Sequence, residues 1–147
     1  SVTGRVDQAG YLARALGMHA TFGANLRLGD GGEYGTAILS RFPITDTANT
    51  LLPNRPGLEQ RGLLRATIEP NGRPISLYST HLQHRPESMR IVQARALAQA
   101  LAADPRPLVV GGDFNASPSS PVMQIVRGAA ADSWLRAGRG AARVRRA

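Results

Sequence analysis

Two polar side chains directly follow a short apolar run in the last third of the sequence. Asp113 and Asn115 stand in residues 108–118, L-V-V-G-G-D-F-N-A-S-P, and residues two apart project the same way from an extended segment. Such a pair offers hard oxygen ligands for Mg²⁺, or a carboxylate to orient a water and an amide to hold a phosphoryl oxygen. Gly111 and Gly112 would let a ligand approach the backbone closely. A turn stabilised by the Asp and Asn side chains is an equally compatible alternative.

A histidine stands at the end of a second strand-like run. Residues 75–84 read I-S-L-Y-S-T-H-L-Q-H. A period of two places four of them on one face, namely Ile75, Leu77, Ser79 and His81. We therefore expect His81 to continue a buried row at the exit of the strand, where it can donate a hydrogen bond to an anionic oxygen. The alternative is a half-buried histidine bonded to a backbone carbonyl, and His84 is expected to be exposed.

The elements that must position these residues follow from apolar periodicity and from turn residues. Asn71-Gly72 between two strand-like runs predicts a hairpin of antiparallel strands. In chain order we expect a helix over 5–16, a strand over 35–40, a loop over 50–57, hairpin strands over 63–68 and 74–80, a helix over 87–103, a strand over 108–111 and a helix over 121–126. This order indicates a mixed α/β layered domain.

The composition is that of one globular domain with its own core, since the chain has 147 residues, of which 42% are hydrophobic. Cysteine is absent, which excludes disulfide scaffolds, thiolate zinc sites and cysteine nucleophiles. No apolar run approaches the roughly 18 residues of a membrane span. The net charge is +8, but all 18 basic residues are arginines and five of them stand in the last twelve residues. The remaining 13 arginines face 10 acidic residues, so the body is only mildly basic and does not require a nucleic acid partner.

Four segments, taken in order, resemble the endonuclease/exonuclease/phosphatase superfamily. They are E-Y-G-T-A-I-L-S-R-F-P-I at 33–44, E-Q-R-G at 59–62, T-H-L at 80–82 with Arg90 and Gln93 on the next helix, and G-D-F-N-A at 112–116. The step D-S-W at 132–134 fits as well, so the resemblance covers about residues 5–136. It implies a layered α/β sandwich of two mixed, mostly antiparallel sheets flanked by helices, and hydrolysis of phosphodiesters or phosphomonoesters with Mg²⁺ or Mn²⁺.

The resemblance also implies roles for individual residues. His81 would match the histidine that hydrogen-bonds the scissile phosphate and stabilises its developing charge. Asp113 would match the carboxylate that orients or deprotonates the attacking water, and Asn115 the amide that holds a phosphoryl oxygen or a metal-bound water. Asp113 and Asn115 would also border the position of a second metal ion.

Other residues have two interpretations in this picture. Glu33, Arg61 and Tyr78 would lie near the site, or would serve as a turn acid, a sheet-edge ion pair and a core tyrosine. Arg90 and Gln93 are expected to pack the scaffold.

Several elements of the family are missing from the sequence. The family's first strand, with an asparagine and the glutamate that is its main magnesium ligand, would lie upstream of Ser1. There is no R-I-D element and no closing S-D-H-x-P, and the Arg-rich residues 138–147 match nothing in the family. We therefore expect a partial domain over 1–137, truncated at both ends and weakly active or inactive.

Two competing interpretations require other sequence features. A calcineurin-like metallophosphoesterase would need G-N-H-D and G-H-x-H elements, and neither exists here. A non-catalytic remnant or basic nucleic-acid-binding module stays open, although aromatic residues, which such binders use for stacking, make up only 5% of the chain. The expected partner is a phosphate ester, whether nucleic acid, lipid headgroup or small molecule, and no protein partner is predicted.

Overall fold

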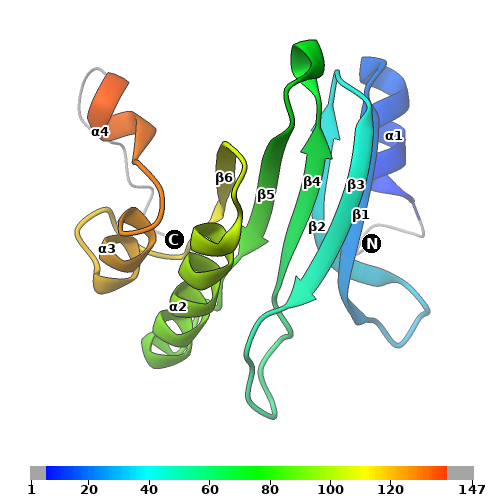
Figure 1. The fold of residues 1–147 in the computed structure, drawn as a ribbon. Helices are drawn as coiled ribbons and strands as arrows, with labels where there is room; N and C mark the ends of the chain where they lie inside the picture. The colour runs from blue at the N-terminus through cyan, green and yellow to red at the C-terminus, as the bar shows by residue number, and fades with distance from the viewer. Residues whose placement is uncertain (1–5, 139–147) are drawn as a thin grey trace.

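The structure, a computed structural model, describes residues 6–138 and contains two β-sheets with helices at their flanks (Figure 1). In chain order the elements are α1 (Gln8–Leu16), β1 (His19–Arg27), β2 (Glu33–Ser40), β3 (Ile44–Leu51), β4 (Gly62–Ile68), the 3₁₀ turn η1 (Pro70–Gly72), β5 (Ile75–His81), α2 (Glu87–Ala103), β6 (Leu108–Asp113), α3 (Pro121–Arg127) and α4 (Ser133–Ala137). The Arg-rich tail expected at 138–147 lies, except for Gly138, outside the described residues. No helix of the described part is long and apolar enough to cross a membrane.

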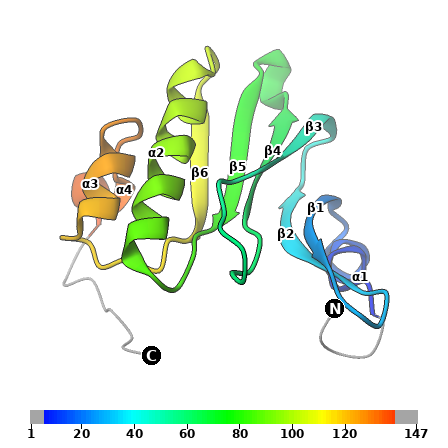
Figure 2. The ribbon, with the colours of Figure 1, turned by 90° about the horizontal axis from the view of Figure 1, so that it is seen from below.

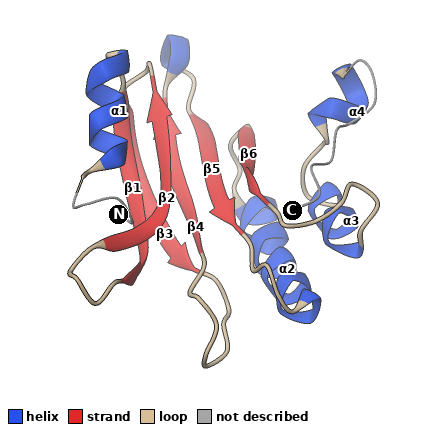
Figure 3. Cartoon of the chain, turned by 180° about the vertical axis from the view of Figure 1, so that it is seen from behind, coloured by secondary structure: helices blue, strands red, loops and turns tan. Residues whose placement is uncertain are grey.

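The larger sheet has the strand order β3-β4-β5-β6, and β1 pairs with β2 in a separate antiparallel hairpin. β3, β4 and β5 are antiparallel neighbours, whereas β6 lies parallel to β5. A parallel neighbour requires a crossover connection, and α2 provides it. Figure 2 shows α1 beside the β1–β2 hairpin and α2 against β5 and β6, and Figure 3 shows the same arrangement from behind. Two sheets flanked by helices confirm the predicted α/β sandwich.

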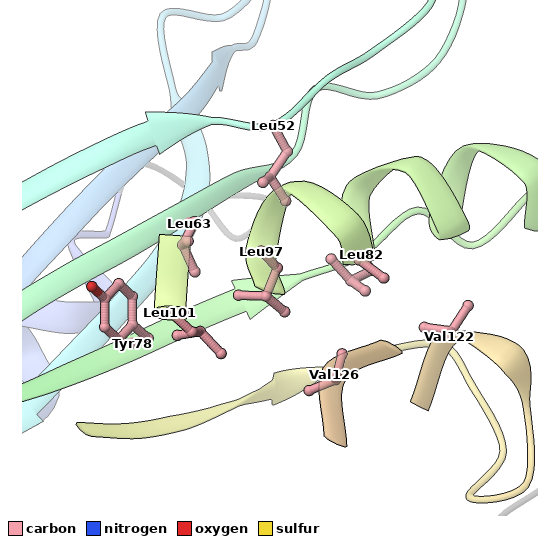
Figure 4. Packing of buried hydrophobic residues seen from close by; sticks show 9 residues of the cluster. Leu52, Leu63, Tyr78, Leu82, Leu97, Leu101, Val122 and Val126 are labelled. Carbon is pink, nitrogen blue, oxygen red and sulfur yellow. The ribbon is translucent and has the colours of Figure 1, made fainter. Parts of the chain in front are cut away.

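The two faces of the four-stranded sheet are covered by different elements. On one face, Tyr78 of β5 packs with α2 and α3 in the main apolar cluster (Figure 4). The members of that cluster are Leu52, Leu63, Tyr78, Leu82, Ala94, Leu97, Leu101, Val122 and Val126. On the other face, Leu64 and Ala66 of β4 pack with Ile38 of the hairpin in a smaller cluster. The larger core therefore lies on the helical side of the sheet.

The row of β5 side chains that includes His81 was expected to be buried, and this prediction is wrong. Ile75, Leu77, Ser79 and His81 are only half-buried, whereas the alternate residues of β5 are buried. The physical reason is coverage, because the half-buried row faces a hairpin of two strands and the buried row faces the helical cluster. Tyr78 is on the buried row, so its interpretation as a core tyrosine is the one the structure supports.

Most of the predicted elements are present. The helix over 87–103 has the predicted bounds, and the first helix ends where expected, at Gly17 with φ 62°. Its start is later than predicted, because the side chain of Asp7 caps it by accepting from the backbone N–H of Gly10. Asn71 and Gly72 both have positive φ, 54° and 72°, and join antiparallel β4 and β5 as expected.

Two strands were not predicted. β1 reads H-A-T-F-G-A-N-L-R and β3 reads I-T-D-T-A-N-T-L, and neither has an apolar run. Almost all of β3 is exposed, so no burial pattern marks it. Polar contacts join it to the hairpin instead, since Asn49 Nδ2 donates to the carbonyl oxygen of Ala24 at 2.9 Å. The predicted loop over 50–57 accordingly begins only after Leu51.

Candidate active site

The ends of β5 and β6 bring the two predicted segments together. The parallel register pairs His81 with Asp113, and the backbone N–H of Leu82 donates to the Asp113 carbonyl oxygen at 2.9 Å. His81 Nε2 lies 3.8 Å from Asp113 Oδ2. The His81 side chain is 30% exposed and that of Asp113 is 64% exposed, so a ligand can reach both. Carboxyl ends of strands are where ligand sites of α/β sheets are found.

Gly112 allows β6 to stay in register beside β5 at this point. Its φ is 144°, and a Cβ there would lie only 1.9 Å from the carbonyl oxygen of Thr80. At Gly111, by contrast, an added Cβ would meet nothing within 4 Å. The two glycines were expected to admit a ligand, but Gly112 makes room for the neighbouring strand.

Asn115 is held by three contacts. Its backbone N–H donates to Asp113 Oδ1 at 2.9 Å, which is the turn considered as the alternative for this segment. Its side-chain Nδ2 donates to the carbonyl oxygen of Leu82 at 2.9 Å, and its Oδ1 lies 3.4 Å from His84 Nδ1. Because Nδ2 is bonded to the chain, the side-chain orientation is fixed. The turn and a positioned amide therefore coexist.

An open hollow of about 280 Å³ adjoins these residues. Asp113 and Asn115 line it together with Arg127 and Asp132. Arg127 Nη2 lies 2.8 Å from Asp132 Oδ2, and hydrogen bonds from Arg127 hold the pKa of Asp132 below its usual range. A larger hollow, of about 1030 Å³, lies between α1 and the β1–β2 hairpin, and its lining includes none of His81, Asp113 and Asn115. The smaller hollow therefore adjoins Asp113 and Asn115, whereas His81 does not line it.

The other side of the His81 ring faces the hairpin and the loop before β4. Arg61 Nη1 lies 3.1 Å from His81 Nδ1, and the hydroxyl of Tyr34 lies 3.4 Å from the same atom. Arg61 also pairs with Glu59 at 2.6 Å, so it is ion-paired as expected, but it precedes the interior strand β4 and does not lie at a sheet edge. Burial lowers the pKa of His81, and the positive charge of Arg61 lowers it further, against the opposing effect of Asp113.

Sequence reasoning did not single out Tyr34 or Glu59. Both stand in the segments that carry the family resemblance, 33–44 and 59–62, and that is the signal that could have found them. Glu33, the neighbour that was considered, instead lies 3.5 Å from Arg27 across the hairpin. Contacts between two sheets decide which of these side chains reaches the histidine.

Arg90 and Gln93 pack the scaffold, as expected. Gln93 Oε1 accepts from the backbone N–H of Gln83 at 2.8 Å, and its Nε2 donates to the carbonyl oxygen of Pro53. Arg90 Nη1 donates to the carbonyl oxygens of Gln83 and His84. Both side chains of α2 thus brace the loop that follows His81. His84 itself is exposed, as predicted.

The donor set for a metal ion is small. Among residues 6–138 no three His, Cys, Asp or Glu side chains are grouped so that they could hold an ion. The carboxylate of Asp113 and Oδ1 of Asn115 are two oxygen donors on one exposed turn. Mg²⁺ in proteins is commonly held by one or two carboxylates and several waters. The Asp113 carboxylate and Asn115 Oδ1 therefore fit part of the coordination shell of Mg²⁺.

The chain is similar to known proteins in both sequence and fold. A model of the Endonuclease/Exonuclease/phosphatase family matches residues 4–145. Protein cwh43 of Schizosaccharomyces pombe is 34% identical over 112 residues, which are 76% of this chain and 11% of that protein. The chain thus spans only a small part of that relative.

Solved structures show the same fold. The human Nocturnin catalytic domain, determined with a bound sulfate anion, is 29% identical with a TM-score of 0.67, and the match covers 80% of this chain and 50% of that one. A mannosyl-6-phosphatase from Bacteroides thetaiotaomicron is 16% identical with a TM-score of 0.70, over 82% of this chain and 52% of that one. The latter is a likeness of fold alone. Because the family model matches residues 4–145 of the 147 residues, the chain belongs to the endonuclease/exonuclease/phosphatase family.

Proposed function

We propose that this chain carries part of the active site of a divalent-metal-dependent phosphoesterase that hydrolyses a phosphodiester or a phosphomonoester. The observation that supports this most directly is the pairing of His81 with Asp113 at adjacent strand ends, 3.8 Å apart and open to a ligand. Membership of a family of nucleases and phosphatases gives the reaction class. The chain spans only about half of the Nocturnin domain, so we also propose, and do not infer from that relative, the activity and substrate of the whole protein.

In this proposal His81 donates a hydrogen bond to a phosphoryl oxygen and so stabilises the charge that develops on it. Asp113 accepts a proton from the attacking water or orients that water, since its carboxylate is exposed and stands beside the histidine. Asn115 presents a fixed amide to a phosphoryl oxygen, because one of its N–H groups is already bonded to Leu82. These three residues approach the phosphate from two strand ends and one turn.

The proposed cofactor is Mg²⁺ or Mn²⁺, held by Asp113 and Asn115. When bound, such an ion polarises a phosphoryl oxygen and stabilises transition-state charge. Since the described residues supply only two donors to it, we propose that this chain alone is weakly active. The proposed substrate is a phosphate ester, whether nucleic acid, lipid headgroup or small molecule.

The test is hydrolysis of bis(p-nitrophenyl) phosphate by the chain with Mg²⁺, with Mn²⁺ and with a chelator. Turnover is expected to be slow, to require the ion, and to be lost in Asp113→Ala. Glu69→Ala is the matched control, because Glu69 is an exposed carboxylate at the opposite end of β5. Circular dichroism would establish equal folding of all three proteins. No ion-dependent turnover by the folded chain, or equal turnover in Asp113→Ala, would contradict the proposal.

A further inference from the structure

The imidazole of His81 has hydrogen-bond donors at its Nδ1 atom. Arg61 Nη1 lies 3.1 Å from Nδ1 and the Tyr34 hydroxyl 3.4 Å from it. A guanidinium has N–H donors only and cannot accept a hydrogen bond. An Nδ1 that faces it must therefore offer its lone pair, and the single proton of the neutral ring must be on Nε2.

We infer that Arg61, assisted by Tyr34, is a positioning residue that holds His81 in the tautomer with its proton on Nε2. The inference rests on the proposed function, in which this N–H group donates a hydrogen bond to a phosphoryl oxygen. Nε2 is 3.8 Å from Asp113 Oδ2, which is longer than a hydrogen bond. The N–H is therefore left for an incoming acceptor. In the other tautomer a lone pair would face the anionic substrate and repel it.

Arg61 is itself held in place. Its side chain is 7% exposed and lies 2.6 Å from Glu59 Oε1, which balances its charge. Its Nε is 3.4 Å from Gln83 Oε1, and the backbone of Gln83 is in turn bonded to Gln93. A guanidinium can make these contacts from Nε and Nη1 at once, whereas the ammonium of a lysine has a single nitrogen.

The burial of Arg61 favours a role in positioning His81 over direct binding of the substrate. A guanidinium that contacts the substrate needs free donors at the surface, but Arg61 is buried and its Nη1 faces Glu59 and His81. Arg61 is therefore expected to act through His81. Direct contact with the phosphate is the alternative outcome of the test.

The test is a long-range ¹H–¹⁵N correlation spectrum of the ¹⁵N-histidine-labelled chain at about pH 8, where imidazole is neutral. The His81 signals are assigned by their loss in His81→Ala. Wild type is expected to show a protonated Nε2 and an unprotonated Nδ1. In Arg61→Met and in the milder Arg61→Lys, the His81 signals are expected to move toward the average of both tautomers, and Tyr34→Phe is expected to produce a smaller change. Arg65→Lys is the control, because Arg65 is paired with Asp46 on the same sheet.

Turnover of bis(p-nitrophenyl) phosphate supplies the second readout. If Arg61 acts through His81, kcat falls about tenfold or more in Arg61→Lys with little change in KM, as for loss of one oriented donor. A rise in KM with an unchanged His81 spectrum would instead assign Arg61 to substrate binding and overturn the inference. So would a wild-type spectrum with the proton on Nδ1. The spectrum does not depend on turnover, so failure of the phosphoesterase proposal would be seen separately.

Discussion

His81 Nε2 faces Asp113 Oδ2 across 3.8 Å, and the two residues are paired in register at the ends of the parallel strands β5 and β6. Each side chain is thus carried by a strand rather than by a long loop. Two hydrogen bonds, Leu82 N–H to the Asp113 carbonyl and Asn115 Nδ2 to the Leu82 carbonyl, tie the two strand ends together. The relative position of the candidate groups therefore depends on the sheet and on α2, which joins the strands.

Replacing His81 by alanine is expected to lower ion-dependent turnover at least about tenfold, which corresponds to ~1.4 kcal/mol of transition-state stabilisation. The reason is loss of the N–H that would face the phosphate. The measurement is kcat for bis(p-nitrophenyl) phosphate, with His19→Ala as the control, because His19 is an exposed histidine at the start of β1. A smaller decrease in the folded variant would show that His81 does not contact the phosphate.

Gly112→Ala is expected to lower the free energy of unfolding by about 2 kcal/mol or more, because it combines positive φ with a steric clash. The added Cβ would lie 1.9 Å from the carbonyl oxygen of Thr80, so β6 must shift away from β5. Asp113 shifts with it, and turnover should fall as well. Gly111→Ala is the matched control, since its Cβ would have open space. Urea unfolding of both variants gives the comparison, and equal stabilities would refute the assigned role of Gly112.

Replacing Asn71-Gly72 by Ala-Ala is expected to destabilise the fold without affecting the chemistry. Both residues have positive φ, which costs an alanine roughly 1–2 kcal/mol. The turn joins β4 to the start of β5, at the far end of that strand from His81. Urea unfolding should therefore move to a lower midpoint while turnover per folded molecule stays the same. A loss of turnover in the folded fraction would mean that the turn and the site are coupled.

Asp104 gives the fold a dependence on acid. Hydrogen bonds from Arg106 hold the pKa of Asp104 well below its usual range, although burial acts in the opposite direction. The side chain is 3% exposed and also accepts from the Tyr78 hydroxyl at 2.8 Å. Because the pKa is lower in the folded than in the unfolded chain, the stabilisation is present above about pH 4 and is lost as the pH falls through the folded value.

Asp104→Asn should therefore lower the free energy of unfolding by about 2 kcal/mol at neutral pH and by clearly less near pH 2. The measurement is urea unfolding of both proteins across that range. Asp46→Asn is the control, since an exposed ion pair such as Asp46–Arg65 contributes little. A difference between wild type and Asp104→Asn that does not change with pH would contradict the assignment.

The sequence was informative wherever local chemistry and periodicity agree. The helix over 87–103 has apolar residues at regular spacing, and Asn71-Gly72 can adopt the positive φ that its turn requires. His81, Asp113 and Asn115 were recognisable because polar groups that follow apolar strands need a reason to be there. Each of these features can be recognised from residues that are close together in the sequence.

What could not be predicted depends on contacts between distant elements. β3 is a polar, exposed strand whose place is set by pairing with β4, so its own sequence carries no pattern. The approach of Arg61 and Tyr34 to one nitrogen of His81 requires the hairpin to pack on the sheet. No periodicity within β2 or the loop before β4 encodes that contact.

The crossover between β5 and β6 also affects the order in which the strands pair during folding. β4 and β5 are joined by the short segment 69–74, whereas β6 can join β5 only after residues 82–107 have been arranged, which costs more chain entropy. The antiparallel pair β4–β5 is therefore expected to form before the site does. A chain from which β6 has detached keeps this pair but has lost Asp113 from its place beside His81. Amide hydrogen exchange of the described strands should accordingly be faster in β6 than in β4 and β5. The candidate active site would then be lost in local openings that leave most of the sheet intact.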